Sequence, residues 1–189
     1  MPKLDLAYCM TLQPKQAIAY LAEKGFAITW AWEELWQEAQ AQAFTVAKVT
    51  RLDILQDIRA AVETVLAEGK TYAWFAKELT PVLQAKGWWG TQDHIDPETG
   101  EVSQVQLGSP WRLRTIFRTN VQTAYMAGRF QSQLENVDDR PYWKYVAVLD
   151  GHTRPSHRAM NGKVLRYDDP FWAEFYPPNG WGCRCRVTT

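Results

Sequence analysis

Apolar side chains recur at intervals of three and four residues through most of the chain before residue 140, which is the period of amphipathic helices. The pattern predicts helices in the first half of the chain over residues 13–25, 32–44, 52–69 and 71–83. Because Pro81 lies inside the last of these, we expect a break or kink near Thr80. Ser109 and Pro110 favour the start of a further, long helix, since Ser caps helix N-termini and Pro suits a first turn.

Two segments depart from this helical period. Residues 87–110 contain the turn signal Asp96-Pro-Glu-Thr-Gly100, which predicts a long loop or a small hairpin, and such elements usually bind or move. Near the C-terminus the apolar residues alternate instead. This alternation predicts three short antiparallel strands packed on the long helix, within residues 143–149, 163–165 and 183–187.

The expected fold class is therefore α+β, with a mainly helical body and a small C-terminal antiparallel β module. The chain has 189 residues, 46% of them hydrophobic, which suffices for one core with a small appended module. We divide it into a helical N-terminal region, a loop or hairpin insertion, and a core made of the long helix and the small sheet. These regions are residues 1–86, 87–110 and 111–189.

Charge is unevenly distributed along the chain, although the net charge is zero. Residues 1–109 carry nine Lys and Arg against fourteen Asp and Glu, whereas residues 110–189 carry twelve against seven. The acidic front and the basic rear indicate surfaces for different partners. An imbalance of this size is too modest to indicate a nucleic-acid-binding protein by itself.

The long helix is expected to carry a basic face, made of Arg112, Arg114, Arg118 and Arg129. Such a face could bind phosphates, including those of DNA, or an acidic protein surface. The alternative is a solvated face whose arginines form ion pairs within the helix.

Two of the three histidines and two of the three cysteines lie in the last forty positions. Two nitrogen ligands from His152 and His157 and two sulfur ligands from Cys183 and Cys185 could form a tetrahedral zinc site. Asp150 could replace one of these ligands or accept a hydrogen bond from an imidazole. The alternative is that Asp150 and Thr153 cap a turn while the cysteines lie in a small core.

The same cluster also permits a catalytic interpretation. His152, His157, Asn161 and Asp150 lie within twelve residues, as in the compact metal-dependent sites of small nucleases. That chemistry needs a metal to bind phosphate and a free histidine to act as general base. A cysteine nucleophile is less favoured, since a Cys-Arg-Cys segment in a strand is not an activating helix N-terminus.

Cysteine usage and hydropathy indicate the compartment in which the chain is made. Three cysteines, two of them separated by one residue, are unlike a secreted disulfide framework. The first residues lack a sustained apolar stretch, and no run approaches the length of a membrane-spanning helix. We therefore expect no signal peptide, no membrane partner and synthesis in a reducing cytoplasm.

The C-terminal motifs are similar to those of a known family. Leu149-Asp-Gly-His-Thr-Arg-Pro-Ser-His-Arg-Ala-Met-Asn-Gly162 and Tyr176-Pro-Pro-Asn-Gly-Trp-Gly-Cys-Arg-Cys185 resemble the phage Mu F-like family of head morphogenesis proteins. The likeness extends to Leu83-Gln-Ala-Lys-Gly-Trp-Trp-Gly90 and Leu107-Gly-Ser-Pro-Trp-Arg-Leu-Arg114, so it covers nearly the whole chain.

The resemblance implies a minor head protein in a phage or prophage virion or procapsid, made in the cytoplasm of the bacterial host. It implies action at the portal vertex in head morphogenesis and in DNA packaging or delivery. The implied partners are the portal protein and other head proteins, with possible DNA contact. Family members often carry cysteine or histidine at positions matching His157, Cys183 and Cys185, which fits a metal-stabilised module. His152 is the least supported ligand, since Arg is common there. No established enzymatic activity is implied, and a metal-dependent nuclease is the alternative function.

Overall fold

The computed structural model describes residues 15–28, 43–96, 99–180 and 182–189, and the chain forms two compact units. We call Leu21–Phe117 the helical unit, and Met1–Tyr20 together with Arg118–Thr189 the C-terminal unit. The helix predicted over residues 32–44 lies outside the described residues. No helix in the described part of the chain is long and apolar enough to cross a membrane.

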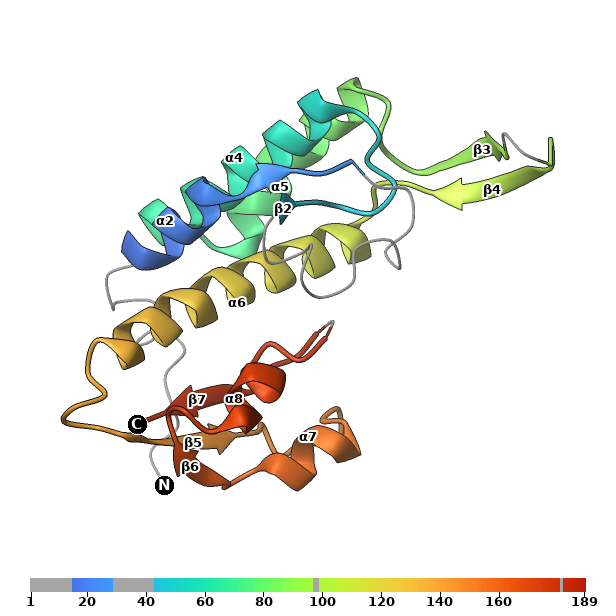
Figure 1. Cartoon of the computed structure of the whole chain (residues 1–189). Helices are drawn as coiled ribbons and strands as arrows, with labels where there is room; N and C mark the ends of the chain where they lie inside the picture. Colours follow the sequence, from blue (N-terminus) through green and yellow to red (C-terminus); the bar gives the residue numbers. More distant parts are fainter. Residues whose placement is uncertain (1–14, 29–42, 97–98, 181) are drawn as a thin grey trace. The chain divides into compact units, whose positions relative to one another are not determined.

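Two apolar stripes predicted from the sequence form the centre of the helical unit, as helices α4 (Leu52–Glu68) and α5 (Tyr72–Ala85) (Figure 1). The side chains on these stripes are fully or almost fully buried: Leu55, Ile58, Val62, Phe75 and Leu83. Helix α4 ends at Gly69, which adopts the left-handed conformation with φ 64°. The Thr71 side chain accepts a hydrogen bond from the backbone N–H of Trp74 and caps α5, as the sequence predicts.

The break expected near Thr80 is absent, because α5 continues through Pro81 to Ala85. Pro81 removes the donor that would pair with the Lys77 carbonyl. Both residues are exposed, so water can satisfy that carbonyl. The Thr80 hydroxyl donates to the Ala76 carbonyl one turn earlier at 2.6 Å. The predicted break is wrong because a proline on the exposed side of a helix costs less than one on the buried side, whereas the alternative, a kink, stays a prediction.

The insertion at residues 87–110 is a hairpin and not a long loop. Strands β3 (Thr91–Ile95) and β4 (Val102–Gln106) pair antiparallel, and Figure 1 shows them extending away from the helices of their unit. At the turn the Asp96 carboxylate accepts a hydrogen bond from the Thr99 backbone N–H at 2.9 Å. Elsewhere in this unit, β1 (Gly25–Phe26) pairs parallel with β2 (Ala43–Phe44).

The base of the hairpin packs closely at Gly108. A Cβ atom added there would lie 2.5 Å from the Trp88 carbonyl oxygen and 2.5 Å from a carbon of the Trp89 ring. We therefore expect Gly108→Ala to lower the free energy of unfolding by about 1–3 kcal/mol. Gly25→Ala is the matched control, since a Cβ there meets nothing within 4 Å. Urea unfolding of both variants measures the difference, and equal losses would contradict this packing argument.

The C-terminal unit holds the predicted three-stranded sheet, with strand order β6-β5-β7 and antiparallel pairing throughout. The strands are β5 (Tyr142–Val146), β6 (Val164–Arg166) and β7 (Arg186–Thr188). Helix α6 (Pro110–Leu134) passes from the helical unit into this one, and its Phe130 and Leu134 pack against the sheet. The α+β class and the packing of the sheet on the long helix are confirmed.

The unit also contains elements that the sequence analysis did not predict. Helices α7 (Pro155–Met160) and α8 (Pro170–Phe175) are short, and each begins with a proline in its first turn. Strand β5 ends at Val146, because the next backbone N–H, that of Ala147, donates its hydrogen bond to the Asn161 side chain. By contrast, helix α2 (Lys15–Glu23), which crosses the boundary between the two units, was predicted and occupies the middle of the first predicted helix.

Candidate metal centre

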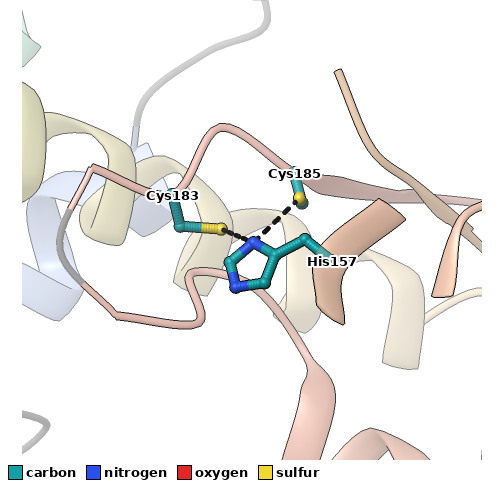
Figure 2. A group of neighbouring side chains, drawn as sticks. All are labelled: His157, Cys183 and Cys185. Carbon is teal, nitrogen blue, oxygen red and sulfur yellow. Dashed lines mark hydrogen bonds between the residues drawn. The ribbon is translucent and has the colours of Figure 1, made fainter. Parts of the chain in front are cut away.

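One imidazole and two thiols meet in the C-terminal unit (Figure 2). His157 lies on α7, which Pro155 starts, and Cys183 and Cys185 lie in the segment that leads into β7. The His157 Nδ1 atom is 3.8 Å from the Cys183 sulfur and 3.5 Å from the Cys185 sulfur. All three side chains are buried, and their ligand atoms all lie within 4.8 Å of one another.

These separations suit a shared metal ion. With zinc bonds of about 2.3 Å to sulfur and about 2.0–2.1 Å to nitrogen, tetrahedral ligation places sulfur and nitrogen about 3.5 Å apart. The two measured sulfur–nitrogen distances are within a few tenths of an ångström of that value. Two thiolates and one imidazole are ligands that zinc prefers, so the residues present fit the metal that the sequence analysis expected.

The two thiols differ in their readiness to lose a proton. A hydrogen bond from Cys185 holds the pKa of the Cys183 thiol at about 6, with the Arg154 charge acting in the same direction. The pKa of Cys185 is raised, because it donates to Cys183 and is also buried. Metal ligation needs the thiolate form, so metal binding would release the protons of thiols that still carry them.

The structure separates Asp150 from the three clustered ligands. Its carboxylate forms a two-pronged ion pair with Arg184, with both N–O distances at 2.6 Å. It also accepts hydrogen bonds from the His152 backbone N–H at 3.0 Å and from the Thr153 hydroxyl at 3.2 Å. Asp150 therefore caps the turn before α7, which was the alternative left open by the sequence.

The pKa of Asp150 lies well below its usual range, mainly because Arg184 donates hydrogen bonds to the carboxylate. The hydrogen bond from the His152 backbone N–H acts in the same direction. A carboxylate with a lowered pKa adds stability above the ordinary value of about 3.9 and loses it as the pH falls below that value. We therefore expect Asp150→Asn to lower the melting temperature of metal-free protein at pH 7. The difference from wild type should narrow below about pH 4.

The matched control is Asp168→Asn, which removes a single, longer contact of 3.3 Å with Arg166. Its effect should be smaller, since exposed single ion pairs contribute little. Calorimetric scans between neutral and acidic pH measure both variants. A gap between Asp150→Asn and wild type that stays constant down to about pH 3 would contradict the assigned role of this ion pair.

His152 is exposed, and it borders the same cavity as the three ligands. That cavity has a volume of about 230 Å³, and its lining also includes Thr153, Arg154 and Arg184. Among the described residues only His157, Cys183 and Cys185 form a cluster able to hold a metal. A fourth ligand would therefore come from water in this cavity or from a shift of His152.

The arrangement limits what chemistry the site can support. Zinc with three protein ligands and an open position is the usual catalytic form, and hydrolysis then needs a general base. The Asp150 carboxylate is held by Arg184. Asn161, which the nuclease hypothesis invokes, accepts a hydrogen bond from the Ala147 backbone N–H. Both residues therefore have structural contacts, and exposed His152, at the edge of the cavity, is the remaining candidate for a general base.

Sequence analysis did not identify two residues that shape the site. Arg184, between the two cysteines, holds Asp150, and Asn179 donates hydrogen bonds to the Phe175 carbonyl and the Tyr145 hydroxyl. Asn179 thereby anchors the chain just before the cysteines. The Asn179-Gly180 pair marks this turn in the sequence, but no sequence signal identifies its distant partner Tyr145.

The four arginines expected to form one basic face have different environments. Arg112 donates to the backbone carbonyls of Gln106 and Leu107, and Arg129 donates to that of Val187. Arg114 is exposed and lies over the Tyr72 ring at 5.2 Å, and Arg118 is exposed. Two of the arginines thus bind backbone within their own units, and Arg114 and Arg118 are the more accessible for a partner.

Comparison with known proteins shows extensive similarity to phage proteins. A model of the family described as "Phage Mu protein F like protein" matches residues 56–188. "Putative capsid assembly protein F" of Escherichia phage Mu is 52% identical over 184 residues, covering 97% of this chain and 42% of that protein. "Mu-like prophage FluMu F protein" of Haemophilus influenzae is 54% identical over 160 residues, covering 85% of this chain and 37% of that protein.

The chain thus spans less than half the length of either relative. No solved structure matches it. The family model includes the hairpin and all three clustered ligands, and it confirms the resemblance that the C-terminal motifs indicated. Since the match covers well over half of the chain, the protein belongs to the phage Mu protein F-like family.

Proposed function

We propose that the chain acts in assembly of a phage head, as a minor head protein at the portal vertex with a part in DNA packaging or delivery. The observation that carries this proposal is the similarity of 97% of the chain to a protein named as a capsid assembly protein. The virion or procapsid, formed in the host cell, is the corresponding location. The portal protein and other head proteins are the corresponding partners.

The geometry of the C-terminal unit supports an assembly role in preference to an enzymatic one. The three ligands connect α7 to the segment before β7, so a bound zinc would join two parts of a small sheet module. Small modules have limited hydrophobic cores and are often stabilised by a structural metal. We therefore propose zinc as a structural component, held by His157, Cys183 and Cys185.

The helical unit offers an accessible aromatic side chain for protein contact. Trp111, in the first turn of α6, is 73% exposed. Tryptophan contributes disproportionately to binding where protein surfaces meet. Arg114, one turn further along, is exposed as well and could bind an acidic surface beside it.

Co-purification with the portal protein encoded in the same phage or prophage tests the assembly role. Wild-type protein should be retained by tagged portal protein, and Trp111→Ala should weaken this retention without changing the melting temperature. Glu78→Ala is a matched surface control in the same unit and should be retained like wild type. Failure of the wild-type protein to associate with portal, alone or with the major head protein present, would contradict the proposal.

A metal-dependent nuclease is the second candidate, favoured by the open coordination position beside the cavity of about 230 Å³. Plasmid DNA incubated with the protein and added Mg²⁺, Mn²⁺ or Zn²⁺ tests it directly. Cleavage that His157→Ala abolishes, with His94→Ala as the matched control, would replace the structural assignment of the metal. We expect no cleavage above that of the His157→Ala protein.

A further inference from the structure

The β3–β4 hairpin has one face that is almost completely exposed. The strand register pairs Ile95 with Val102 and Asp93 with Gln104. Ile95 is 64% exposed and Val102 is 61% exposed, so two apolar side chains lie side by side in solvent. We call this surface, made of Asp93, Ile95, Val102 and Gln104, the arm face.

The hairpin is firmly anchored at its base, so the arm face has a defined position within its unit. The Gln106 side chain donates to the carbonyls of Gly90 and Gly108 at 2.9 Å each. The Arg112 guanidinium donates to the carbonyls of Gln106 and Leu107 at 2.9 and 3.0 Å. An isolated two-stranded hairpin is marginally stable in water, and these contacts compensate for its missing third strand.

The arm carries a concentrated negative charge. Residues 91–106 include four carboxylates, Asp93, Asp96, Glu98 and Glu101, and no Lys or Arg. The helical unit as a whole has thirteen Asp and Glu against nine Lys and Arg. The hairpin therefore accounts for the whole net charge of its unit, and it would be repelled by DNA phosphates.

A face of opposite charge and similar construction lies on the C-terminal sheet. The register pairs Tyr142 with Arg166 and Lys144 with Val164, so alternation places all four side chains on one face. Tyr142 is 62% exposed and Val164 is 54% exposed, and Lys144 and Arg166 are exposed as well. We call this surface the sheet face; the opposite side of the sheet is buried in the core.

We propose that the arm face of one copy packs on the sheet face of a second copy. Each face presents two exposed apolar side chains beside charged groups. These are Asp93 on the arm face, with Glu101 next to Val102 in the chain, and Lys144 and Arg166 on the sheet face. The C-terminal unit as a whole has twelve Lys and Arg against eight Asp and Glu. Like faces repel each other, whereas unlike faces combine apolar burial with ionic attraction, so the copies associate head to tail.

Head-to-tail contacts leave one free arm face and one free sheet face at the ends of any short series. Such contacts form rings when the rotation closes and open chains when it does not. Both faces are small, so the association is weak and needs a high local concentration. The flanking charges are exposed, so salt screens the attraction. The proposal does not depend on the metal or on the identity of the other head proteins.

Sedimentation velocity of the full chain tests the proposal at about 50 mM and about 500 mM salt, between which screening increases strongly. At low salt we expect the weight-average mass to increase with protein concentration above the 21.8 kDa of the monomer. At high salt we expect it to remain at the monomer mass. The arm variant Asp93→Lys with Glu101→Lys should remain monomeric at low salt. The sheet variant Lys144→Glu with Arg166→Glu should do so too.

An equimolar mixture of the two variants should recover association, because the reversed arm of one then faces the reversed sheet of the other. Glu68→Lys with Glu78→Lys, which makes the same charge change elsewhere on the helical unit, should behave as wild type. Circular dichroism and melting temperatures establish that each variant is folded. A wild-type protein that is monomeric under all conditions would overturn the proposal. Self-association that both variants retain, or a mixture that stays monomeric, would overturn it equally.

Discussion

His157→Ala is expected to abolish stoichiometric zinc binding and to lower the melting temperature of the protein purified with zinc. The substitution removes the nitrogen that lies 3.5 and 3.8 Å from the two sulfurs. A ligand present at a thousand times its dissociation constant stabilises the folded state by about 4 kcal/mol. For a chain of 150–250 residues each kcal/mol corresponds to about 2–4 °C, so we expect a decrease of about 8–16 °C.

His94→Ala is the matched control, because His94 lies on β3, outside the cluster. The His94→Ala protein should bind as much zinc as wild type and melt at nearly the same temperature. Cys185→Ser should behave like His157→Ala, whereas His152→Ala should keep stoichiometric zinc, since water can take the fourth position. The stabilising role of zinc would be contradicted if EDTA-treated and zinc-loaded wild type melted at the same temperature.

Trp143→Ala is expected to cause the largest loss of stability among single core substitutions, about 3–5 kcal/mol. The Trp143 side chain is completely buried in the C-terminal unit. Its ring lies 5.6 Å from that of Phe130, 5.7 Å from that of Trp172 and 5.8 Å from that of Tyr176. Removing it would leave a large cavity at the contact between α6 and the sheet.

Trp111→Ala is the matched control, since that side chain is 73% exposed and its loss should change stability by less than about 0.5 kcal/mol. Trp143→Phe separates packing from polarity. The Trp143 indole N–H is buried without a hydrogen-bond partner among the described residues, so Phe removes this cost while keeping an aromatic ring. In urea unfolding, the free energy of unfolding of Trp143→Phe should be well above that of Trp143→Ala. Equal losses for Trp143→Ala and Trp111→Ala would contradict the assigned core.

The helices of the body were the most predictable part of the fold. The apolar stripe of α4 contains Leu55, Ile58 and Val62 at helical spacing, and all three are fully buried. Local signals placed the ends well, because Gly69 and Thr71 act through their own backbone geometry and nearest neighbours. The break predicted at Pro81 is absent, since the energetic cost of a proline depends on which side of the helix it occupies.

The candidate site was predictable in its chemistry and not in its arrangement. Residue types alone grouped His157 with Cys183 and Cys185, and the structure brings these three together. Asp150 was grouped with them by its position in the chain. Its actual partner, Arg184, is 34 positions away and was not considered. Sequence spacing carries no information on which distant polar group a loop carboxylate will pair with.

The cysteines also show how tertiary contacts change a local pattern. Alternation over residues 183–187 predicted a strand, but β7 begins only at Arg186. The Cys183 backbone N–H donates to the Gly180 carbonyl in a turn, and Asn179 holds the preceding segment. In this arrangement the Cys183 and Cys185 sulfurs lie 3.8 and 3.5 Å from His157 Nδ1.

The two proposed features act at different levels. Zinc would stabilise the C-terminal unit internally, through His157 and the two cysteines. The arm face and the sheet face would act between copies, with charges that lie outside the metal cluster. A variant without zinc could therefore lose self-association only through loss of the sheet, which its melting behaviour would reveal. Charge reversal on the arm should leave zinc content unchanged.

The metal content and ligand shell of the purified full chain give the sharpest test of a zinc ion held by His157, Cys183 and Cys185. Elemental analysis combined with X-ray absorption spectroscopy at the zinc edge measures both. We expect one zinc per chain, with two sulfur ligands at about 2.3 Å and the remaining ligands nitrogen or oxygen at about 2.0–2.1 Å. A protein that takes up no zinc after refolding with it, or a bound zinc without sulfur ligands, would contradict the account.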